Sequence, residues 1–288
     1  MAPDTKPTAP TPTTYEFLQD TPPGPSFERG WPVRTGDVDP ERRVRLDGIA
    51  RYAQDMANDE MFHRGFQATD PYWLVRRTII DVLEPLHWPS DVTLTRWCES
   101  TSSRWCNMRI TMTGSAGGRV ETEGFWIRFN ADNGMPTHIS DGGMQYLTQY
   151  VTETRLRWKA LNTEPMPAPS ATDREFDLRA TDFDPFQHLN NAAYWQLVED
   201  DLSGDPLLAG PHRGIIEYLQ PLPLGSRVQM RTVRDDAGYR LWLVRLGDDG
   251  VASDKPAATV SVVPLPGEKF APAPPWPPEQ VDAVEWKD

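Results

Sequence analysis

One stretch of this sequence brings together an acid, an imidazole and two amides: residues 182–191, D-F-D-P-F-Q-H-L-N-N. Asp184 and His188 lie four residues apart, just before an apolar helix that Asn190 or Asn191 would cap. A carboxylate beside a histidine fixes its tautomer and raises its basicity, which makes a general base for water. Backbone amides at a helix start stabilise negative charge, so this stretch is suited to bind an oxyanion.

The same residues also have a purely structural interpretation, because Asp-Pro opens turns and Asn caps helices. An earlier segment of the same chain can be compared with this one. Residues 33–40, V-R-T-G-D-V-D-P, match residues 178–185, L-R-A-T-D-F-D-P, and Asp39 and Asp184 lie 145 positions apart. After Asp39 the sequence E-R-R-V-R-L-D has no histidine and no amide pair, although a helix follows there too. The fold therefore does not require H-L-N-N, which favours a functional interpretation.

The remaining histidines are weaker candidates. His63 falls in the last turn of a predicted helix, where a cation interacts favourably with the helix dipole. Three others fall in predicted surface loops: His87, His138 and His212. The sequence has no G-x-S-x-G elbow, Walker loop, G-x-G-x-x-G or H-E-x-x-H, so serine hydrolases, nucleotide-binding proteins and zinc proteases find no support.

Composition narrows the class of protein. With 29 basic and 42 acidic residues the net charge is −13, which disfavours a general nucleic-acid partner. No stretch approaches the about 18 apolar residues of a spanning helix, so no membrane insertion is expected. Cys98 and Cys106 are too few for a disulfide framework and indicate a cytoplasmic protein.

Two similar series of elements surround the motif and its earlier copy. Apolar residues at helical spacing predict a helix from Leu46 to near Gly65, and a second, buried helix that begins at Asn190 or Asn191. A period of two then predicts strands over residues 91–99, 104–113, 119–129, 213–220, 226–234, 239–247 and 256–264. A helix followed by an antiparallel meander, given twice, indicates an α+β fold, a tandem hotdog in which each sheet wraps around a central helix.

Composition also divides the chain into five parts. Residues 1–28 and 266–288 are rich in proline and predict extended tails, and residues 162–173 predict a linker. We therefore expect hotdog domains over residues 29–161 and 174–265, of which the second carries the acid and the histidine. Because a tandem hotdog pairs its halves within one chain, a monomer or a homodimer is expected.

Two segments carry a resemblance to a known family. Residues 182–194, D-F-D-P-F-Q-H-L-N-N-A-A-Y, resemble the motif D-x-D-x-N-x-H-V-N-N-x-x-Y of the acyl-acyl-carrier-protein thioesterases, a tandem-hotdog family of plant plastids and bacteria. Residues 73–98 include L-H-W-P-S-D-V-T-L-T-R-W-C and resemble the family's P-x-W-x-D-x-V followed by T-W. The resemblance covers residues 30–265 and implies hydrolysis of fatty acyl thioesters in fatty acid biosynthesis.

Carried over by position, the resemblance implies that Asp184 and His188 are the catalytic acid and histidine. The family's asparagine falls on Phe186, and Pro221 stands where the family has a glutamate. Three polar residues are candidates to replace the missing groups: Gln187, Asn190 and Glu217. If none of them does so, the activity is reduced, altered or lost.

We therefore expect a thioesterase that releases a fatty acid from acyl carrier protein or coenzyme A without a cofactor or metal. His188 activates or positions water, Asp184 orients His188 or acts as a nucleophile, and amides around Asn190 and Asn191 bind the oxyanion. Three residues are expected to contact the substrate: Phe186, Gln187 and Glu217.

The acyl chain would lie between the helix and the sheet of the first half, and an acidic carrier would dock on a basic patch. Two groups of residues are candidates for that patch: Arg42, Arg43 and Arg45, or Arg155, Arg157 and Lys159. Two alternatives stay open. A silent hotdog would bind acyl chains or carrier proteins without hydrolysis, and a hydratase would add water to an acyl thioester. Hotdog hydratases of the D-x-N-P-x-H type separate acid and histidine by five residues, whereas the four found here favour hydrolysis.

Overall fold

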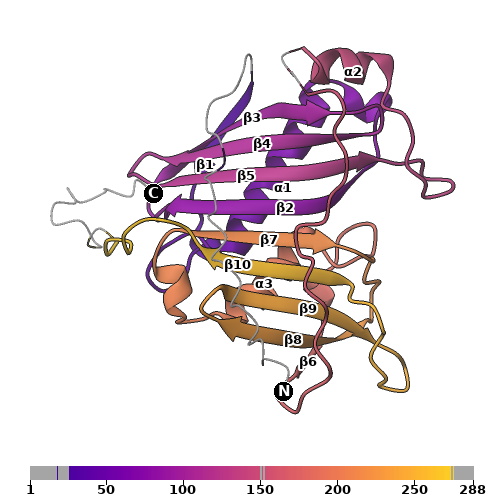
Figure 1. The fold of residues 1–288 in the computed structure, drawn as a ribbon. Coiled ribbons are helices and arrows are strands. Elements are labelled where there is room, and N and C mark those ends of the chain that lie inside the picture. Colours follow the sequence, from indigo (N-terminus) through magenta and orange to yellow (C-terminus); the bar gives the residue numbers. More distant parts are fainter. Residues whose placement is uncertain (1–17, 19–25, 150, 152, 274, 276–288) are drawn as a thin grey trace, which may run out of the picture.

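The computed structural model describes residues 18, 26–149, 151, 153–273 and 275 of the 288-residue chain. Within these residues ten antiparallel strands form one sheet in the order β1-β3-β4-β5-β2-β7-β10-β9-β8-β6 (Figure 1). The first half contributes β1 (Phe27–Pro32), β2 (Trp73–Glu84), β3 (Asp91–Thr101), β4 (Trp105–Gly114) and β5 (Arg119–Arg128). The second half contributes β6 (Arg174–Asp177), β7 (His212–Tyr218), β8 (Arg227–Asp235), β9 (Gly238–Leu246) and β10 (Ala258–Pro264). Strands β2 and β7 pair at the centre and join the two half-sheets.

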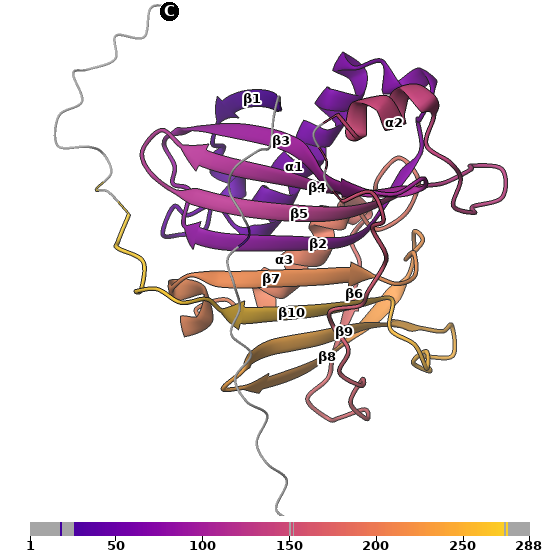
Figure 2. The ribbon, with the colours of Figure 1, turned by 45° about the horizontal axis from the view of Figure 1, so that its top comes forward.

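One long helix covers the same face of each half-sheet: α1 (Leu46–His63) in the first half and α3 (Asn191–Asp201) in the second (Figures 1 and 2). The two helices also pack against each other. A shorter helix, α2 (Asp141–Leu147), covers a small apolar cluster at one end of the first half. Two similar units of sheet and helix, joined through their central strands, confirm the predicted α+β tandem hotdog. No helix in the described part of the chain is long and apolar enough to span a membrane.

The helix starts follow from local sequence. Asn190 caps α3, because its side-chain oxygen accepts a hydrogen bond from the Ala192 amide at 2.9 Å. Trp195 of α3 is fully buried and lies against Gly214 of β7. A Cβ atom at Gly214 would come within 2.8 Å of the indole ring, so glycine is needed for α3 to approach the sheet this closely.

The turn before each helix is built twice with the same hydrogen bonds. In both copies the aspartate amide donates to the carbonyl oxygen four residues further on, at 2.9 Å. The residue before that carbonyl has a left-handed φ, 64° in the first copy and 61° in the second, which non-glycine residues seldom adopt. The equivalent pairs, each 145 positions apart, are Asp39 and Asp184, Arg42 and Gln187, and Arg43 and His188. The repeat seen in the sequence is therefore a repeat of backbone structure.

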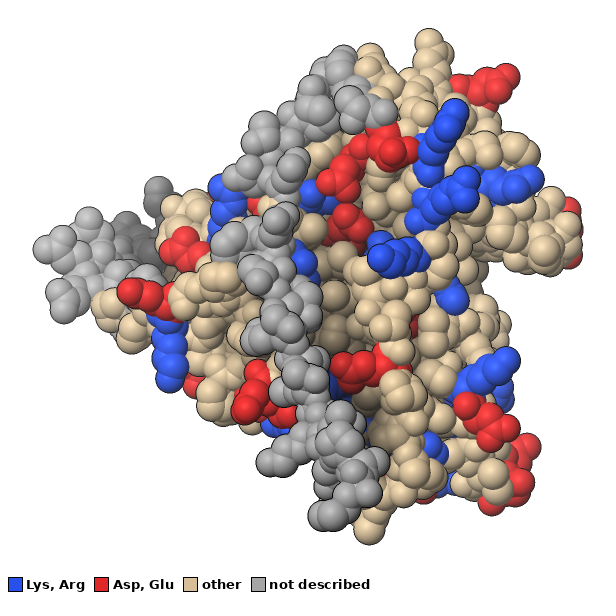
Figure 3. Space-filling view, viewed as in Figure 1, with Lys and Arg blue, Asp and Glu red and all other residues tan. Residues whose placement is uncertain are grey.

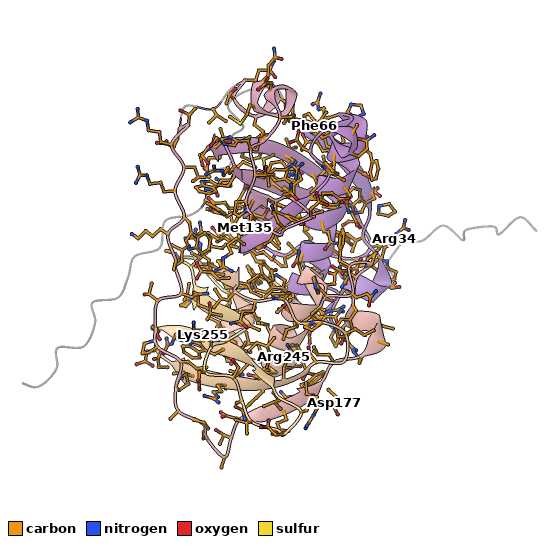
Figure 4. All side chains as sticks on the ribbon, turned by 90° about the vertical axis from the view of Figure 1, so that its right-hand side faces the viewer. Arg34, Phe66, Met135, Asp177, Arg245 and Lys255 are labelled. Carbon is orange, nitrogen blue, oxygen red and sulfur yellow. The ribbon has the colours of Figure 1, made fainter. Side chains whose placement is uncertain are left out.

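The segment between α2 and β6 crosses the outer face of the sheet, on the opposite side from the helices (Figures 1 and 4). We call its residues 153–161 the strap. Trp158 of the strap packs edge-on against Phe125 of β5, with ring centroids 5.1 Å apart. The Arg77 guanidinium donates to the Lys159 carbonyl oxygen at 2.8 Å, so side chains of the sheet fix the strap's path.

Some expectations need correction. The prediction that His212 lies in a surface loop is wrong: it begins β7 and is buried, and burial lowers its pKa to about 4. Residues 27 and 28, expected in the first tail, belong to β1, and the periodicity gave no sign of α2 or β6. Most of the predicted tails, residues 1–17, 19–25, 274 and 276–288, lie outside the described residues.

Candidate functional site

The Asp184 carboxylate closes the turn before α3. Its Oδ1 atom accepts hydrogen bonds from the backbone amides of Phe186 at 2.9 Å and His188 at 3.2 Å. In the first copy, Oδ1 of Asp39 accepts the Arg43 amide at 2.8 Å in the same way. One oxygen of each aspartate therefore has a structural role that the two copies share.

The second oxygen of each aspartate differs between the copies. Oδ2 of Asp39 is neutralised by the Arg43 guanidinium, whose Nη2 lies 2.8 Å away. His188 occupies the place of Arg43 in the second copy, and its imidazole is exposed. Within the described residues neither Oδ2 of Asp184 nor the His188 imidazole makes a hydrogen bond, so the expected side-chain pair is not formed. The turn nevertheless leaves Oδ2 of Asp184 and the His188 imidazole without hydrogen bonds among the described residues, only four residues apart.

The two helix starts also differ. At α1, the first amide, that of Leu46, donates to Oε1 of Glu199, which reaches over from α3, at 2.6 Å. Burial raises the pKa of Glu199 to about 7. At α3, the equivalent amide is that of Asn191, and no hydrogen bond in the described part of the chain uses it. The start of α1 is closed, and the start of α3 is open.

Two tyrosines that are not among the predicted site residues lie at the open helix start. The Tyr218 hydroxyl donates to the Asn191 carbonyl oxygen at 3.3 Å, and its ring packs edge-on against Tyr194, with centroids 5.1 Å apart. Burial, followed by the charge of Asp184, raises the pKa of Tyr194 and keeps its hydroxyl protonated. Tyr194 is the last residue of the motif segment N-N-A-A-Y, and this place in the motif could have indicated it as a site residue. Tyr218 lies in no motif, so the sequence did not indicate it.

Phe186 and Gln187 form the outer tip of the turn. Phe186 is 69% exposed, so its ring lies on the surface of the protein. Gln187 has the left-handed backbone, and its carbonyl oxygen accepts the Leu224 amide at 3.0 Å. Leu224 is itself 57% exposed, which gives the tip two exposed apolar side chains.

Glu217 lies away from these groups. Strand side chains alternate between faces, and Tyr218 points toward α3, so Glu217 points to the outer face of the sheet. There its Oε1 accepts the Leu161 amide at 2.8 Å and lies 3.7 Å from Arg77 across the β2–β7 junction. A second pair, Asp81 and Arg213, crosses the same junction at 2.6 Å. The structure thus brings Glu217 to the strap rather than to Asp184.

A double hotdog with one open helix start, beside an uncommitted carboxylate and histidine, is an arrangement suited to thioester hydrolysis. The chain belongs to the acyl-ACP thioesterase family: the family's N-terminal domain matches residues 24–147, and its C-terminal domain matches residues 167–251. It is accordingly an enzyme that hydrolyses fatty acyl thioesters.

Relatives and solved structures agree with this assignment. An uncharacterized protein of Mycobacterium tuberculosis is 40% identical over 223 residues, which cover 77% of this chain and 88% of that protein. An acyl-ACP thioesterase from Bacteroides thetaiotaomicron has a TM-score of 0.67 at 14% identity and covers 83% of this chain and 97% of its own. The 12:0-ACP thioesterase from Umbellularia californica has a TM-score of 0.63 at 13% identity, with coverage of 85% and 98%. At these identities the two structures show a shared fold.

Proposed function

We propose that this thioesterase takes its acyl group from an acidic acyl carrier protein and that hydrolysis occurs at the start of α3. The observation that carries the proposal is the Asn191 amide, which lacks a partner among the described residues while the matching Leu46 amide is occupied by Glu199 at 2.6 Å. An open amide at a helix start is a binding site for a carbonyl oxygen that becomes negative. The proposal therefore gives the chain one reaction centre, in its second half.

In the proposed reaction the thioester carbonyl oxygen accepts a hydrogen bond from the Asn191 amide. His188 removes a proton from water while the water oxygen bonds to the carbonyl carbon, which gives a tetrahedral oxyanion. The C=O bond then reforms, the C–S bond breaks, and the imidazolium returns its proton to the departing thiolate. The products are a fatty acid and the carrier thiol. Oδ2 of Asp184, which makes no hydrogen bond within the described residues, orients the imidazole.

Asn190, Phe186 and Gln187 support this centre in our proposal. The Asn190 side chain fixes the first turn of α3 through the Ala192 amide and so aims the neighbouring Asn191 amide. Exposed Phe186 contacts the arm that carries the thioester, and Gln187 shapes the backbone of the tip. Glu217, on the other face of the sheet, has no place in the reaction and supports the strap instead.

We place the acyl chain between α1 and the sheet of the first half. Two buried methionines lie in this region: Met56 of α1 and Met112 of β4. Methionine side chains are flexible and repack readily, so they can yield to an alkyl chain.

The strap supplies the cationic surface that an acidic carrier needs. In the first candidate group, Arg43 pairs with Asp39 at 2.8 Å and Arg45 pairs with Asp47 at 2.9 Å. These two positive charges are therefore neutralised within the chain. The second group consists of three exposed basic residues that alternate along the strap, and the described residues offer these side chains no ion pair: Arg155, Arg157 and Lys159. Figure 3 shows Lys and Arg side chains gathered at the upper right of the outer face.

A chain of contacts links the strap to the reaction centre. The Trp158 ring lies 5.4 Å from the Arg76 guanidinium. Arg76 donates to the carbonyl oxygens of Tyr218 and Leu219, the latter at 3.1 Å. The Tyr218 hydroxyl in turn donates to the Asn191 carbonyl. These contacts thus connect the outer face, where the carrier would dock, through the end of β7 to the start of α3 on the inner face.

We further propose that the enzyme acts in the cytoplasm and in fatty acid biosynthesis. Cys98 and Cys106 are free thiols, which suits a reducing compartment. Acyl carrier proteins carry growing acyl chains there, and a hydrolase that recognises them ends that growth.

A panel of acyl thioesters on carrier protein and on coenzyme A tests the proposal, with thiol release as the readout. We expect release from the wild type and a loss of about 10²-fold or more in His188→Ala. Absence of release on every chain length would contradict the function and favour a silent acyl-binding protein. Water addition to an enoyl thioester without thiol release would favour a hydratase.

A further inference from the structure

Gln54 is a polar residue of α1, in the half of the chain that lacks Asp184 and His188. Its Oε1 atom is buried and has no hydrogen-bond partner within the described residues. A buried acceptor left without a partner destabilises the fold, so a half-buried residue that keeps one calls for a functional explanation.

The internal repeat indicates which helix start Gln54 belongs to. Glu199 is the ninth residue of α3 and Gln54 is the ninth residue of α1, and they lie 145 positions apart, as do the helix starts. Glu199 crosses the helix pair to the first amide of α1. Because the halves repeat and α1 packs on α3, the repeat relation assigns Gln54 the position opposite the first amide of α3, that of Asn191. By this relation, an acceptor and a donor that both lack partners in the described structure belong to the same helix start.

We propose that Gln54 is a positioning residue of the hydrolysis, contributed by the other half, and that its Oε1 holds the attacking water. This inference rests on the proposed function. The water donates one hydrogen to Gln54 and the other to His188, which aims an oxygen lone pair at the carbonyl carbon. The Asn191 amide holds the carbonyl oxygen at the same time. No bond to Gln54 forms or breaks, and the water proton still goes to His188.

The residue type explains why one helix start is open and the other closed. The Glu199 carboxylate makes a charge-assisted hydrogen bond to the Leu46 amide, at 2.6 Å. The neutral carboxamide of Gln54 attracts an amide hydrogen more weakly, so water and substrate can take its place. The difference between glutamate and glutamine at equivalent positions thus separates a structural helix start from a reactive one.

Three full-length variants test the inference on whichever acyl thioester the wild type cleaves fastest. Gln54→Leu removes the acceptor, and we expect kcat to fall about 10²-fold with little change in KM. Its melting temperature should equal or exceed that of the wild type, because the unpaired buried oxygen is gone. Gln54→Glu should also lower kcat, since its carboxylate would take the Asn191 amide as Glu199 takes that of Leu46. Glu199→Gln is the matched control and should keep the wild-type kcat.

Each outcome has a definite meaning. A Gln54→Leu enzyme with wild-type kcat overturns the inference while the proposed function stands. A Gln54→Leu protein that is unfolded or melts well below the wild type also overturns it, because the side chain then has a structural role. A faster Gln54→Glu enzyme would assign the position to a base rather than to water binding. Failure of the wild type to release any thiol would instead contradict the proposed function itself.

Discussion

The Glu199 carboxylate of α3 accepts a hydrogen bond from the Leu46 amide of α1 at 2.6 Å, so the second half of the chain closes the helix start of the first. The equivalent amide in the second half, that of Asn191, has no such partner among the described residues. The two hotdogs share turn, helix and sheet, yet they differ at this contact. In our proposal the closed helix start stabilises the fold, and the open one takes part in the reaction.

Glu199 should make stability depend on pH. Burial raises its pKa from 4.5 to about 7, so the folded chain binds this proton more tightly than the unfolded chain does. Its contribution therefore lowers the free energy of unfolding as pH rises from 4.5 to about 7. Glu199→Gln keeps an oxygen for the Leu46 amide and removes the titration.

Urea unfolding of wild type and Glu199→Gln near the two ends of that range measures the effect. We expect the variant to gain up to about 3 kcal/mol on the wild type between the acidic and the neutral condition. The same pH dependence in both proteins would show that Glu199 titrates normally.

Asp184→Asn distinguishes the structural role of Asp184 in the turn from its proposed role in the reaction. An asparagine oxygen can still accept the Phe186 and His188 amides, so the turn and the melting temperature should be retained. The charge that we propose orients His188 is lost, and we expect kcat to fall about 10²-fold. Asp39→Asn makes the same change in the equivalent turn of the first half and should leave kcat unchanged. Equal losses in the two variants would mean that both aspartates are structural.

Phe186 should affect substrate binding and leave stability unchanged. Since its ring is 69% exposed, Phe186→Asn should change the free energy of unfolding by no more than about 0.5 kcal/mol. We expect KM to rise several-fold at constant kcat, because the lost contact is to the arm of the substrate and not to the reacting atoms. A rise in kcat would instead show that phenylalanine had replaced a useful polar group.

The strap should matter for the protein carrier alone. Reversing its three positive charges, with Arg155→Glu, Arg157→Glu and Lys159→Glu together, should raise KM for acyl carrier protein about tenfold or more at low salt. An uncharged acyl-pantetheine should be cleaved as by the wild type. If both substrates are affected alike, the strap supports the fold and does not dock the carrier.

Local features of the fold were predictable from the sequence. Asn190 caps α3 through the Ala192 amide, and the α1 and α3 boundaries agree with their apolar spacing. The repeated Asp-Pro turn could be aligned because its hydrogen bonds lie within a few residues. These features depend on neighbours along the chain, which sequence patterns report directly.

The missing parts of the site depend on contacts between distant segments. Glu199 and Leu46 are 153 residues apart, and nothing in either neighbourhood indicates their pairing. Alternation alone does not say which face of a strand a substrate uses, so the sequence could not indicate that Glu217 lies on the outer face, at the strap. The Asp184 carboxylate bonds to backbone amides rather than to the imidazole, a choice that depends on the three-dimensional course of the turn.

The central claim is that the Asn191 amide binds the oxyanion, and replacing this residue by proline tests it most directly. Asn191 is the first residue of α3 and Asn190 before it is extended, so proline fits there and removes only the amide hydrogen and the side chain. Asn191→Ala removes the side chain and keeps the amide. We predict that kcat of Asn191→Pro is about 10²–10³-fold below that of Asn191→Ala, with both proteins folded. Equal kcat values in the two variants would contradict the account.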